Sequence, residues 1–193
     1  MIRRNVVIDP IHGNIKMPRW LVRIKEEPPI RRMMDIKQLG LKAFIDFPGA
    51  IHTRYLHCLG TMHLAGKLVD LLIEKAETSG RLNLKCNLEN NKNALMAAGF
   101  FHDIGHGPFS HVIDFVLESR INTDHEEMAT RIVKSNFKDV LEEDSIPVDV
   151  VCQIIIAEHK YPFLSDIIND AMDVDKIDYL ICLLYTSPSP RDR

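Results

Sequence analysis

Two adjacent residues, His102 and Asp103, place an imidazole and a carboxylate directly after an apolar stretch. They follow residues 95–101 (LMAAGFF), which predict a helix buried on all sides. The pair should therefore be buried too, and a buried carboxylate without a partner is costly. A divalent cation could satisfy both groups, because imidazole nitrogen and carboxylate oxygen are both metal ligands. Taken alone, the pair is also compatible with a plain hydrogen-bonded pair.

Two further residues could complete a metal site. His57 lies on an apolar helix predicted from Thr53 onward, and Asp175 lies in residues 173–179 (DVDKIDY). Two histidines with two carboxylates suit iron, manganese, zinc or magnesium and leave positions for water and phosphate. A closed structural zinc site would more often use cysteines. By itself, His57 could be a core histidine and Asp175 a solvated acid.

Residues 101–111 (FHDIGHGPFSH) resemble the signature of the HD-domain deoxynucleoside triphosphate triphosphohydrolases, found in vertebrates and bacteria. Four more segments match the vertebrate type in order: 9–13 (DPIHG), 37–40 (KQLG), 47–50 (FPGA) and 173–179. The resemblance spans nearly all of residues 5–180. It implies a metal-dependent enzyme that splits a deoxynucleoside triphosphate into deoxynucleoside and inorganic triphosphate.

The resemblance also implies roles for the matching residues. The metal ligands would be His57, His102, Asp103 and Asp175. Three histidines would line the phosphates, namely His106, His111 and His125. Of these, His111 would give a proton to the departing 5′ oxygen, and Asp114 could orient its imidazole. The substrate would be held by Arg54 and Lys176 at the phosphates, by Gln38 and Tyr179 near the sugar, and by Leu39.

Partners follow from the same resemblance: a deoxynucleoside triphosphate substrate and a homo-oligomer of the full-length protein. Vertebrate relatives are activated by nucleotides at a separate site. There, Glu26 and Met34 stand where relatives carry an aspartate and an arginine, which puts guanine-nucleotide activation in doubt. Two other classes stay open, namely a different HD phosphohydrolase acting on nucleoside monophosphates or cyclic nucleotides, and an inactive nucleotide- or nucleic-acid-binding homologue.

Composition sets broad limits on these readings. The apolar content of 46%, the charged content of 26% and the net charge of -3 are ordinary for a globular chain. Nucleic acid is therefore expected to be a secondary ligand, and no membrane partner is expected. No apolar run approaches the roughly 20 residues of a membrane span. The four widely spaced cysteines predict an intracellular protein, with cytoplasm and nucleus not distinguished.

The elements that position these residues are predicted to be mainly α-helical, with a small N-terminal β-hairpin. The hairpin would pair residues 6–8 with 15–17 around a turn. Residues 79–93 are asparagine-rich and predict a surface loop. Thr123 and Glu126 form a capping-box pattern at the start of a helix. Helices are predicted over residues 18–24, 30–39, 53 onward, 94–103, 109–117, up to about 136, 148–158 and 165–180.

Residues 1–181 are interpreted as one HD domain that is truncated at its C-terminus. Residues 182–193 break from the helical pattern before them and resemble the translation of a transposase sequencing adapter. We therefore expect the natural protein to continue past residue 181 with a different sequence.

Overall fold

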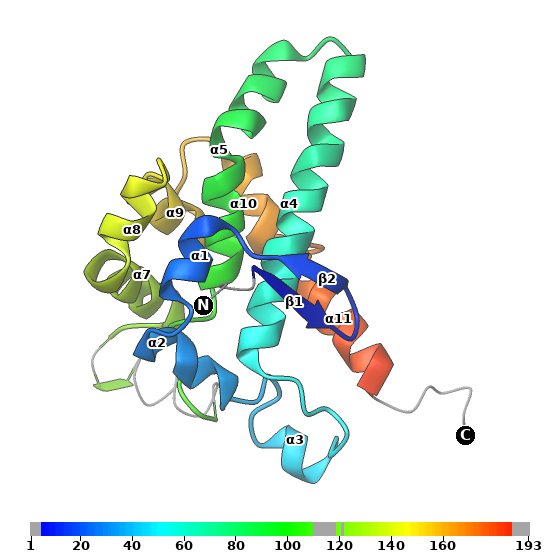
Figure 1. Ribbon diagram of the computed structural model, residues 1–193, viewed down its shortest axis with the longest axis vertical. Helices are drawn as coiled ribbons and strands as arrows, with labels where there is room; N and C mark the ends of the chain where they lie inside the picture. Colours follow the sequence, from blue (N-terminus) through cyan, green and yellow to red (C-terminus); the bar gives the residue numbers. More distant parts are fainter. Residues whose placement is uncertain (1–4, 110–118, 121, 187–193) are drawn as a thin grey trace.

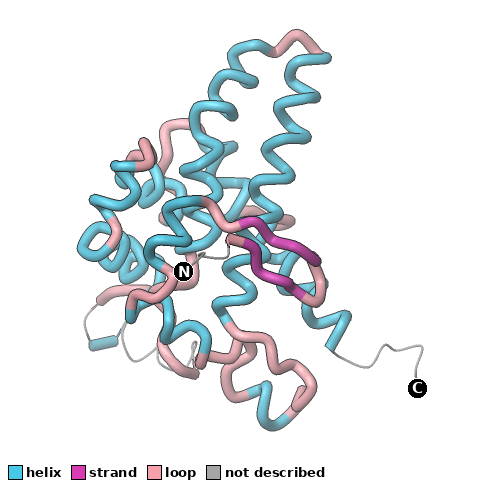
Figure 2. The backbone as a smooth tube through the Cα atoms, viewed as in Figure 1, coloured by secondary structure: helices cyan, strands magenta, loops and turns pink. Residues whose placement is uncertain are grey.

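The computed structural model describes residues 5–109, 119–120 and 122–186, and it is mainly helical with one small hairpin, as predicted (Figures 1 and 2). The N-terminal part holds β1 (Val6–Asp9), β2 (Gly13–Lys16), α1 (Arg19–Ile24), α2 (Pro28–Arg31), the 3-10 helix η1 (Arg32–Met34) and α3 (Lys42–Ile45). The remainder holds α4 (Arg54–Thr78), α5 (Leu82–Phe101), α7 (His125–Asn136), α8 (Lys138–Glu143), α9 (Val148–Ile155), α10 (Pro162–Asn169) and α11 (Val174–Thr186).

Helices α4 and α5 form the frame, running antiparallel through the length of the molecule (Figure 1). Thr53 begins α4 as its N-cap, accepting a hydrogen bond from the Leu56 amide. The two helices approach closely where glycines lie between them. A Cβ at Gly99 would lie 3.4 Å from the Met62 backbone, and one at Gly66 would lie 3.3 Å from the Met96 sulfur. This packing places the C-terminal end of α5 beside the N-terminal half of α4.

The loop predicted over residues 79–93 is wrong, because α5 begins at Leu82 and runs through the asparagine-rich segment. Leu88 is fully buried in the core and Leu84 packs against it, so tertiary burial outweighs weak helix propensity. Asparagine amides also turn back onto the helix. Asn87 donates to the Asn83 carbonyl at 2.9 Å, and Asn91 donates to the Asn87 carbonyl at 2.7 Å.

The predicted start of α7 is wrong by one residue. Asp124, not Thr123, is the N-cap, and its carboxylate accepts a hydrogen bond from the Glu127 amide at 2.7 Å. Thr123 is buried instead. The end of α7 at Asn136 agrees with the prediction.

The helix predicted over residues 165–180 is in fact two helices, α10 and α11, separated at residues 170–173. Asp170 adopts an extended conformation that ends α10. Asp173 then accepts a hydrogen bond from the Lys176 amide at 2.7 Å, which caps a new helix. This break is important for the site, because it puts Asp175 in the first turn of α11.

Other helix boundaries also differ from the prediction. The helix predicted over residues 30–39 begins at Pro28 as α2 and ends as η1 at Met34. A proline is tolerated in the first turn, where its missing N–H leaves no helical bond unmade. Helix α9 ends at Ile155, and the short helices α3 and α8 were not predicted. Most of the helix predicted over 109–117 lies outside the described residues.

The hairpin is confirmed, with β1 and β2 paired antiparallel and Asp9 opposite Gly13. Asp9 organises the turn, because its Oδ1 accepts hydrogen bonds from the amides of Ile11 and His12 at 2.8 and 2.7 Å. Gly13 closes the turn at a φ of 72°, in the left-handed region that glycine adopts without strain. The hairpin lies across α4, near the start of α11 (Figure 1).

Helix α4 is long and apolar enough to cross a membrane by length and composition alone, contrary to the expectation from the sequence. Half of that apolar stretch is buried inside the protein. Its buried face contacts α5, η1, β2 and α11, as expected for the core helix of a globular domain.

We predict that Gly105→Ala destabilises the fold strongly, whereas Gly66→Ala does not. A Cβ at Gly105 would lie 1.9 Å from the backbone oxygen of His125, so the connection between α5 and α7 must shift. We expect a loss of roughly 2–3 kcal/mol in the free energy of unfolding. At Gly66 the new methyl meets only the flexible Met96 side chain, and alanine favours the helix by about 1 kcal/mol. Urea denaturation followed by circular dichroism measures both, and coincident midpoints for the two variants would refute the prediction.

Candidate metal centre

His102 caps the C-terminal end of α5, and it is buried together with Asp103, as the sequence predicts. Its Nδ1 donates a hydrogen bond to the carbonyl of Gly99 at 2.9 Å. A carbonyl oxygen only accepts, so the proton sits on Nδ1 and the lone pair on Nε2 is directed away from the helix. That Nε2 is buried and makes no hydrogen bond within the described part of the chain.

His57 faces the same point from the first turns of α4, and its ring is buried. Its Nδ1 is 2.7 Å from Oδ2 of Asp178. Its Nε2 lies 2.8 Å from Oδ1 of Asp175, in the first turn of α11, but makes no hydrogen bond of proper geometry among the described residues. A ring nitrogen that lies this close to a carboxylate oxygen without a hydrogen bond to it is in the position expected of two ligands that share a cation.

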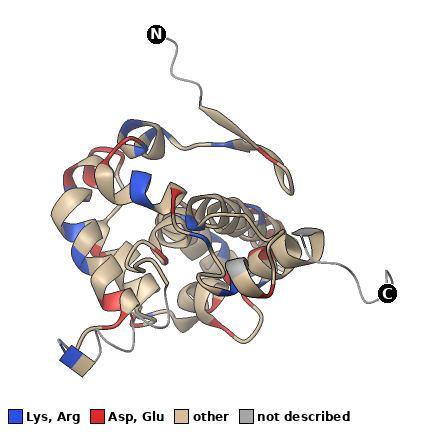
Figure 3. Ribbon diagram, turned by 90° about the horizontal axis from the view of Figure 1, so that it is seen from below, with Lys and Arg blue, Asp and Glu red and all other residues tan. Residues whose placement is uncertain are grey.

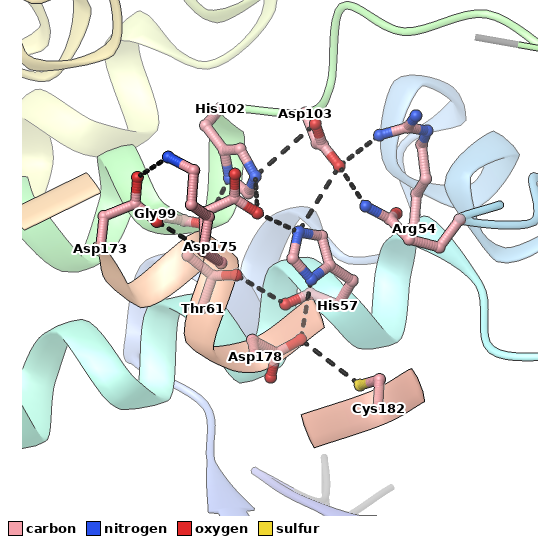
Figure 4. Close-up of polar contacts among 12 residues, drawn as sticks. Arg54, His57, Thr61, Gly99, His102, Asp103, Asp173, Asp175, Asp178 and Cys182 are labelled. Atoms are coloured by element: carbon pink, nitrogen blue, oxygen red, sulfur yellow. Dashed lines mark hydrogen bonds and ion pairs between the residues drawn. The ribbon is translucent and has the colours of Figure 1, made fainter. Parts of the chain in front are cut away.

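The four predicted ligands converge (Figure 4). One ligand atom from each of His57, His102 and Asp175 can be chosen so that all lie within 4.8 Å of one another. Asp103 closes the group, with Oδ1 at 3.6 Å from the His102 Nε2 and Oδ2 at 3.7 Å from the His57 Nε2. Two buried imidazole nitrogens without hydrogen bonds, facing two carboxylates, fit a divalent metal ion. The donor set does not choose between iron, manganese, zinc and magnesium.

Within the cluster, the histidines and Arg54 keep the carboxylates ionised, and the carboxylates in turn raise the pKa of His57. Burial alone would raise the pKa of Asp103, but the charges of His102 and Arg54 hold it well below its usual range. Burial likewise opposes ionisation of Asp175, yet its contacts with His102 and His57 lower its pKa. Burial would lower the pKa of His57, but its contacts with Asp175 and Asp178 raise it to about 10. A cation and a proton therefore compete for His57.

Arg54, the first residue of α4, forms a buried ion pair with Oδ2 of Asp103. Gln38 donates to the same oxygen at 3.4 Å. Oδ1 lies 3.6 Å from Nε2 of His102 and 3.3 Å from Nε2 of His106, whereas His57 lies nearer to Oδ2. The two oxygens of Asp103 thus serve different neighbours.

A cavity of about 670 Å³ opens beside the four-residue cluster. This volume lies in the range of small-molecule sites. Ten of the predicted site residues line it: Gln38, Leu39, Arg54, His102, Asp103, His106, His125, Asp175, Lys176 and Tyr179. His57 lies beneath it, with only 1% of its surface exposed.

His106 and His125 stack ring on ring, with centroids 4.0 Å apart. Burial, helped by the nearby Arg54 charge, lowers the pKa of His106 to about 3 despite the opposing effect of Asp103. His106 is therefore neutral near pH 7. The loop carrying it is braced by Arg32 of η1, which donates to the carbonyls of Ile104 and His106.

Lys176 lines the cavity, but its ammonium group contacts the Asp170 carbonyl and lies 3.0 Å from Oδ2 of Asp173. To contact a phosphate it must extend from this position. Two predicted catalytic residues, His111 and Asp114, lie outside the described residues.

The sequence analysis missed three residues around the centre: Asp178, His12 and Arg32. Asp178 had a detectable signal, because it follows Asp175 by three residues on a helix and so lies on the same face. His12 contacts Asp178 across 166 residues of sequence, and Arg32 contacts Ile104 across 72, so neither contact has a local signal.

Comparison with known proteins agrees with this geometry. The HD domain family model matches residues 54–182, from the start of α4 to α11. The deoxynucleoside triphosphate triphosphohydrolase SAMHD1 homolog of Dictyostelium discoideum is 31% identical over 91% of this chain and 35% of its own length. The human deoxynucleoside triphosphate triphosphohydrolase SAMHD1 is 36% identical over 90% of this chain and 32% of its own length.

A third relative, an uncharacterized Mycoplasma pneumoniae protein described as an MG461 homolog, is 30% identical over 90% of this chain and 41% of its own length. The chain thus spans 32–41% of the length of these three relatives. The family match and the buried His–Asp cluster coincide in the same residues, and the chain belongs to the HD-domain family.

Proposed function

We propose that the protein containing this chain is a metal-dependent phosphohydrolase that converts a deoxynucleoside triphosphate into deoxynucleoside and inorganic triphosphate. The observation that carries this proposal is the convergence of His57, His102 and Asp175, with Asp103 beside both histidines, at a cavity lined by basic and imidazole groups. The names of the relatives support the choice of substrate.

A divalent cation in this site would lower the pKa of a water and polarise the attacked phosphoryl group. The other phosphate oxygens would be bound by Arg54 and Lys176, whose charges offset that of the triphosphate. His106 and His125 would line the phosphates; as a neutral imidazole, His106 can donate one hydrogen bond to an oxygen.

Attack of water at the α-phosphorus would break its bond to the 5′ oxygen and release triphosphate whole. The departing oxygen needs a proton, and His111 is proposed to give it, with Asp114 orienting the ring. Gln38, Leu39 and Tyr179 are proposed to contact the nucleoside, with Gln38 and Tyr179 near the sugar. We further propose that the enzyme acts within cells as a homo-oligomer.

Charge on the described surface gives little support to nucleic acid as the main ligand. Along the ribbon, Lys and Arg positions are scattered among Asp and Glu positions (Figure 3). Proteins that bind single strands without sequence preference combine a basic groove with aromatic platforms. We therefore treat nucleic acid as a secondary ligand.

We predict that the full-length protein that contains this chain, loaded with a suitable divalent metal, releases triphosphate from deoxynucleoside triphosphates. His102→Ala and Asp103→Ala should each lower the rate by about 10²-fold or more, because each removes a metal ligand. Asp139→Ala, at an exposed site on α8, is the matched control and should keep the wild-type rate. Chromatography of the products provides the measurement.

The products also separate the alternatives. Orthophosphate from nucleoside monophosphates, or a linearised cyclic nucleotide, would replace the proposed reaction with another HD phosphohydrolase activity. If the protein binds metal but leaves deoxynucleoside triphosphates intact, the inactive nucleotide-binding homologue becomes the favoured alternative.

We predict that metal binding releases protons and strengthens as the pH rises. A ligating imidazole nitrogen must be unprotonated, and the pKa of His57 is raised to about 10, so the cation displaces a proton throughout the neutral range. Each proton released makes the apparent affinity rise about tenfold per pH unit. Titration calorimetry in two buffers with different ionisation heats counts the protons, and an affinity independent of pH between about 6 and 8 would contradict the prediction.

A further inference from the structure

The carboxylate of Asp178, on α11, lies beside the ring of His57 (Figure 4). Its other oxygen contacts His12, and neither Asp178 nor His12 lines the cavity. Its Oδ2 is 2.7 Å from Nδ1 of His57, and its Oδ1 is 2.5 Å from Nε2 of His12. The side chain of Asp178 is 1% exposed, that of His57 is fully buried and that of His12 is 8% exposed.

We propose that Asp178 is a positioning residue of the metal centre, which sets the orientation and tautomer of His57, and that His12 of the hairpin holds Asp178 in place. The inference rests on the metal site of the proposed function. It adds a carboxylate–histidine–metal arrangement to that site, with a second histidine behind the carboxylate.

The role follows from hydrogen-bonding capacity. An ionised carboxylate accepts hydrogen bonds and does not donate them, so when a metal ion has displaced one proton from His57, the remaining proton is on Nδ1. The lone pair on Nε2 is then directed towards the side of Asp175, whose Oδ1 lies 2.8 Å away, where it can bind the metal ion. A carboxylate behind an imidazole also raises its basicity as a ligand.

The backbone of α4 is shaped to admit this carboxylate. A Cβ at Gly60 would lie 1.9 Å from Oδ1 of Asp178 and 2.9 Å from Nε2 of His12. Gly60 lies within α4, where glycine costs about 1 kcal/mol relative to alanine. The close approach of Asp178 and His12 gives a physical reason for glycine at this position.

His12 reaches Asp178 from the hairpin turn that Asp9 organises through hydrogen bonds to the Ile11 and His12 amides. Its ring also packs edge-on against His63 of α4, with centroids 5.7 Å apart. The hairpin, which has no residue lining the cavity, is thereby connected to the metal centre through one shared carboxylate.

Measuring metal affinity distinguishes a role of Asp178 in positioning His57 from a role in stabilising the fold. The probe is Co²⁺, with its dissociation constant measured by competition with a chromophoric chelator and its ligand-field absorption spectrum recorded. We predict that Asp178→Asn weakens Co²⁺ binding by about 10- to 100-fold and alters the spectrum. His12→Ala should change both in the same direction by less, because it removes the support and keeps the carboxylate.

Two matched controls accompany these variants. Asp139→Asn makes the same chemical change at an exposed site on α8 that does not line the cavity, and it should keep the wild-type Co²⁺ affinity. Gly60→Ala removes no polar group but displaces the carboxylate, so it should weaken Co²⁺ binding. Gly66→Ala, two turns along α4, should not. Thermal melting of each metal-free variant reports the structural effect separately.

Wild-type affinity and spectrum in folded Asp178→Asn would overturn the inference, as would equal losses in Asp139→Asn. If Asp178→Asn does not fold, Gly60→Ala and His12→Ala decide, and unchanged Co²⁺ binding in both overturns it. A wild-type protein that binds Co²⁺ but hydrolyses no deoxynucleoside triphosphate would overturn the proposed function alone. A wild-type protein that binds no divalent cation would overturn both.

Discussion

Buried negative charge at the junction of α4, α5 and α11 is the constraint on which the arrangement of this domain depends. Asp103, Asp173 and Asp178 are buried and Asp175 is partly buried, so each needs a compensating partner. The partners are Arg54 for Asp103, Lys176 for Asp173, and the imidazoles of His57 and His12 for Asp178. Asp175 is shared between His57 and His102, where a cation would complete the compensation.

That constraint explains why glycines occur at the closest contacts of the frame. Gly99 allows α5 to approach the Met62 backbone, Gly60 admits Asp178 and Gly105 lets the connection after α5 pass the start of α7. Each approach positions a polar group of the centre: His102 at the end of α5, Asp178 behind His57, and His125 against His106. Small residues here serve the placement of functional groups as much as the packing of apolar ones.

The sequence correctly predicted those parts of the structure that depend on local patterns of residues. The apolar run before His102 predicted its burial, and a short β-like run followed by turn residues and a segment able to pair back predicted the hairpin. It failed where tertiary contacts override local preference, as in the asparagine-rich start of α5, whose Leu88 is buried by the core. It also joined α10 to α11, because the apolar pattern continues across the break and only the extended backbone of Asp170 interrupts the helix. The His12–Asp178 contact is determined by the fold alone.

The centre has two faces with different chemistry. The inner face, made of Asp178, His12 and Gly60, contributes no residue to the cavity lining, so it can act on a metal ligand but not on a substrate. The outer face presents Arg54, His106, His125 and Lys176 to the cavity, and these groups can discriminate between phosphate esters. Lys176 shows how such discrimination could work. Its ammonium already contacts Asp173 and the Asp170 carbonyl, so a substrate must offer enough negative charge to draw it away. A triphosphate meets that requirement better than a monophosphate does.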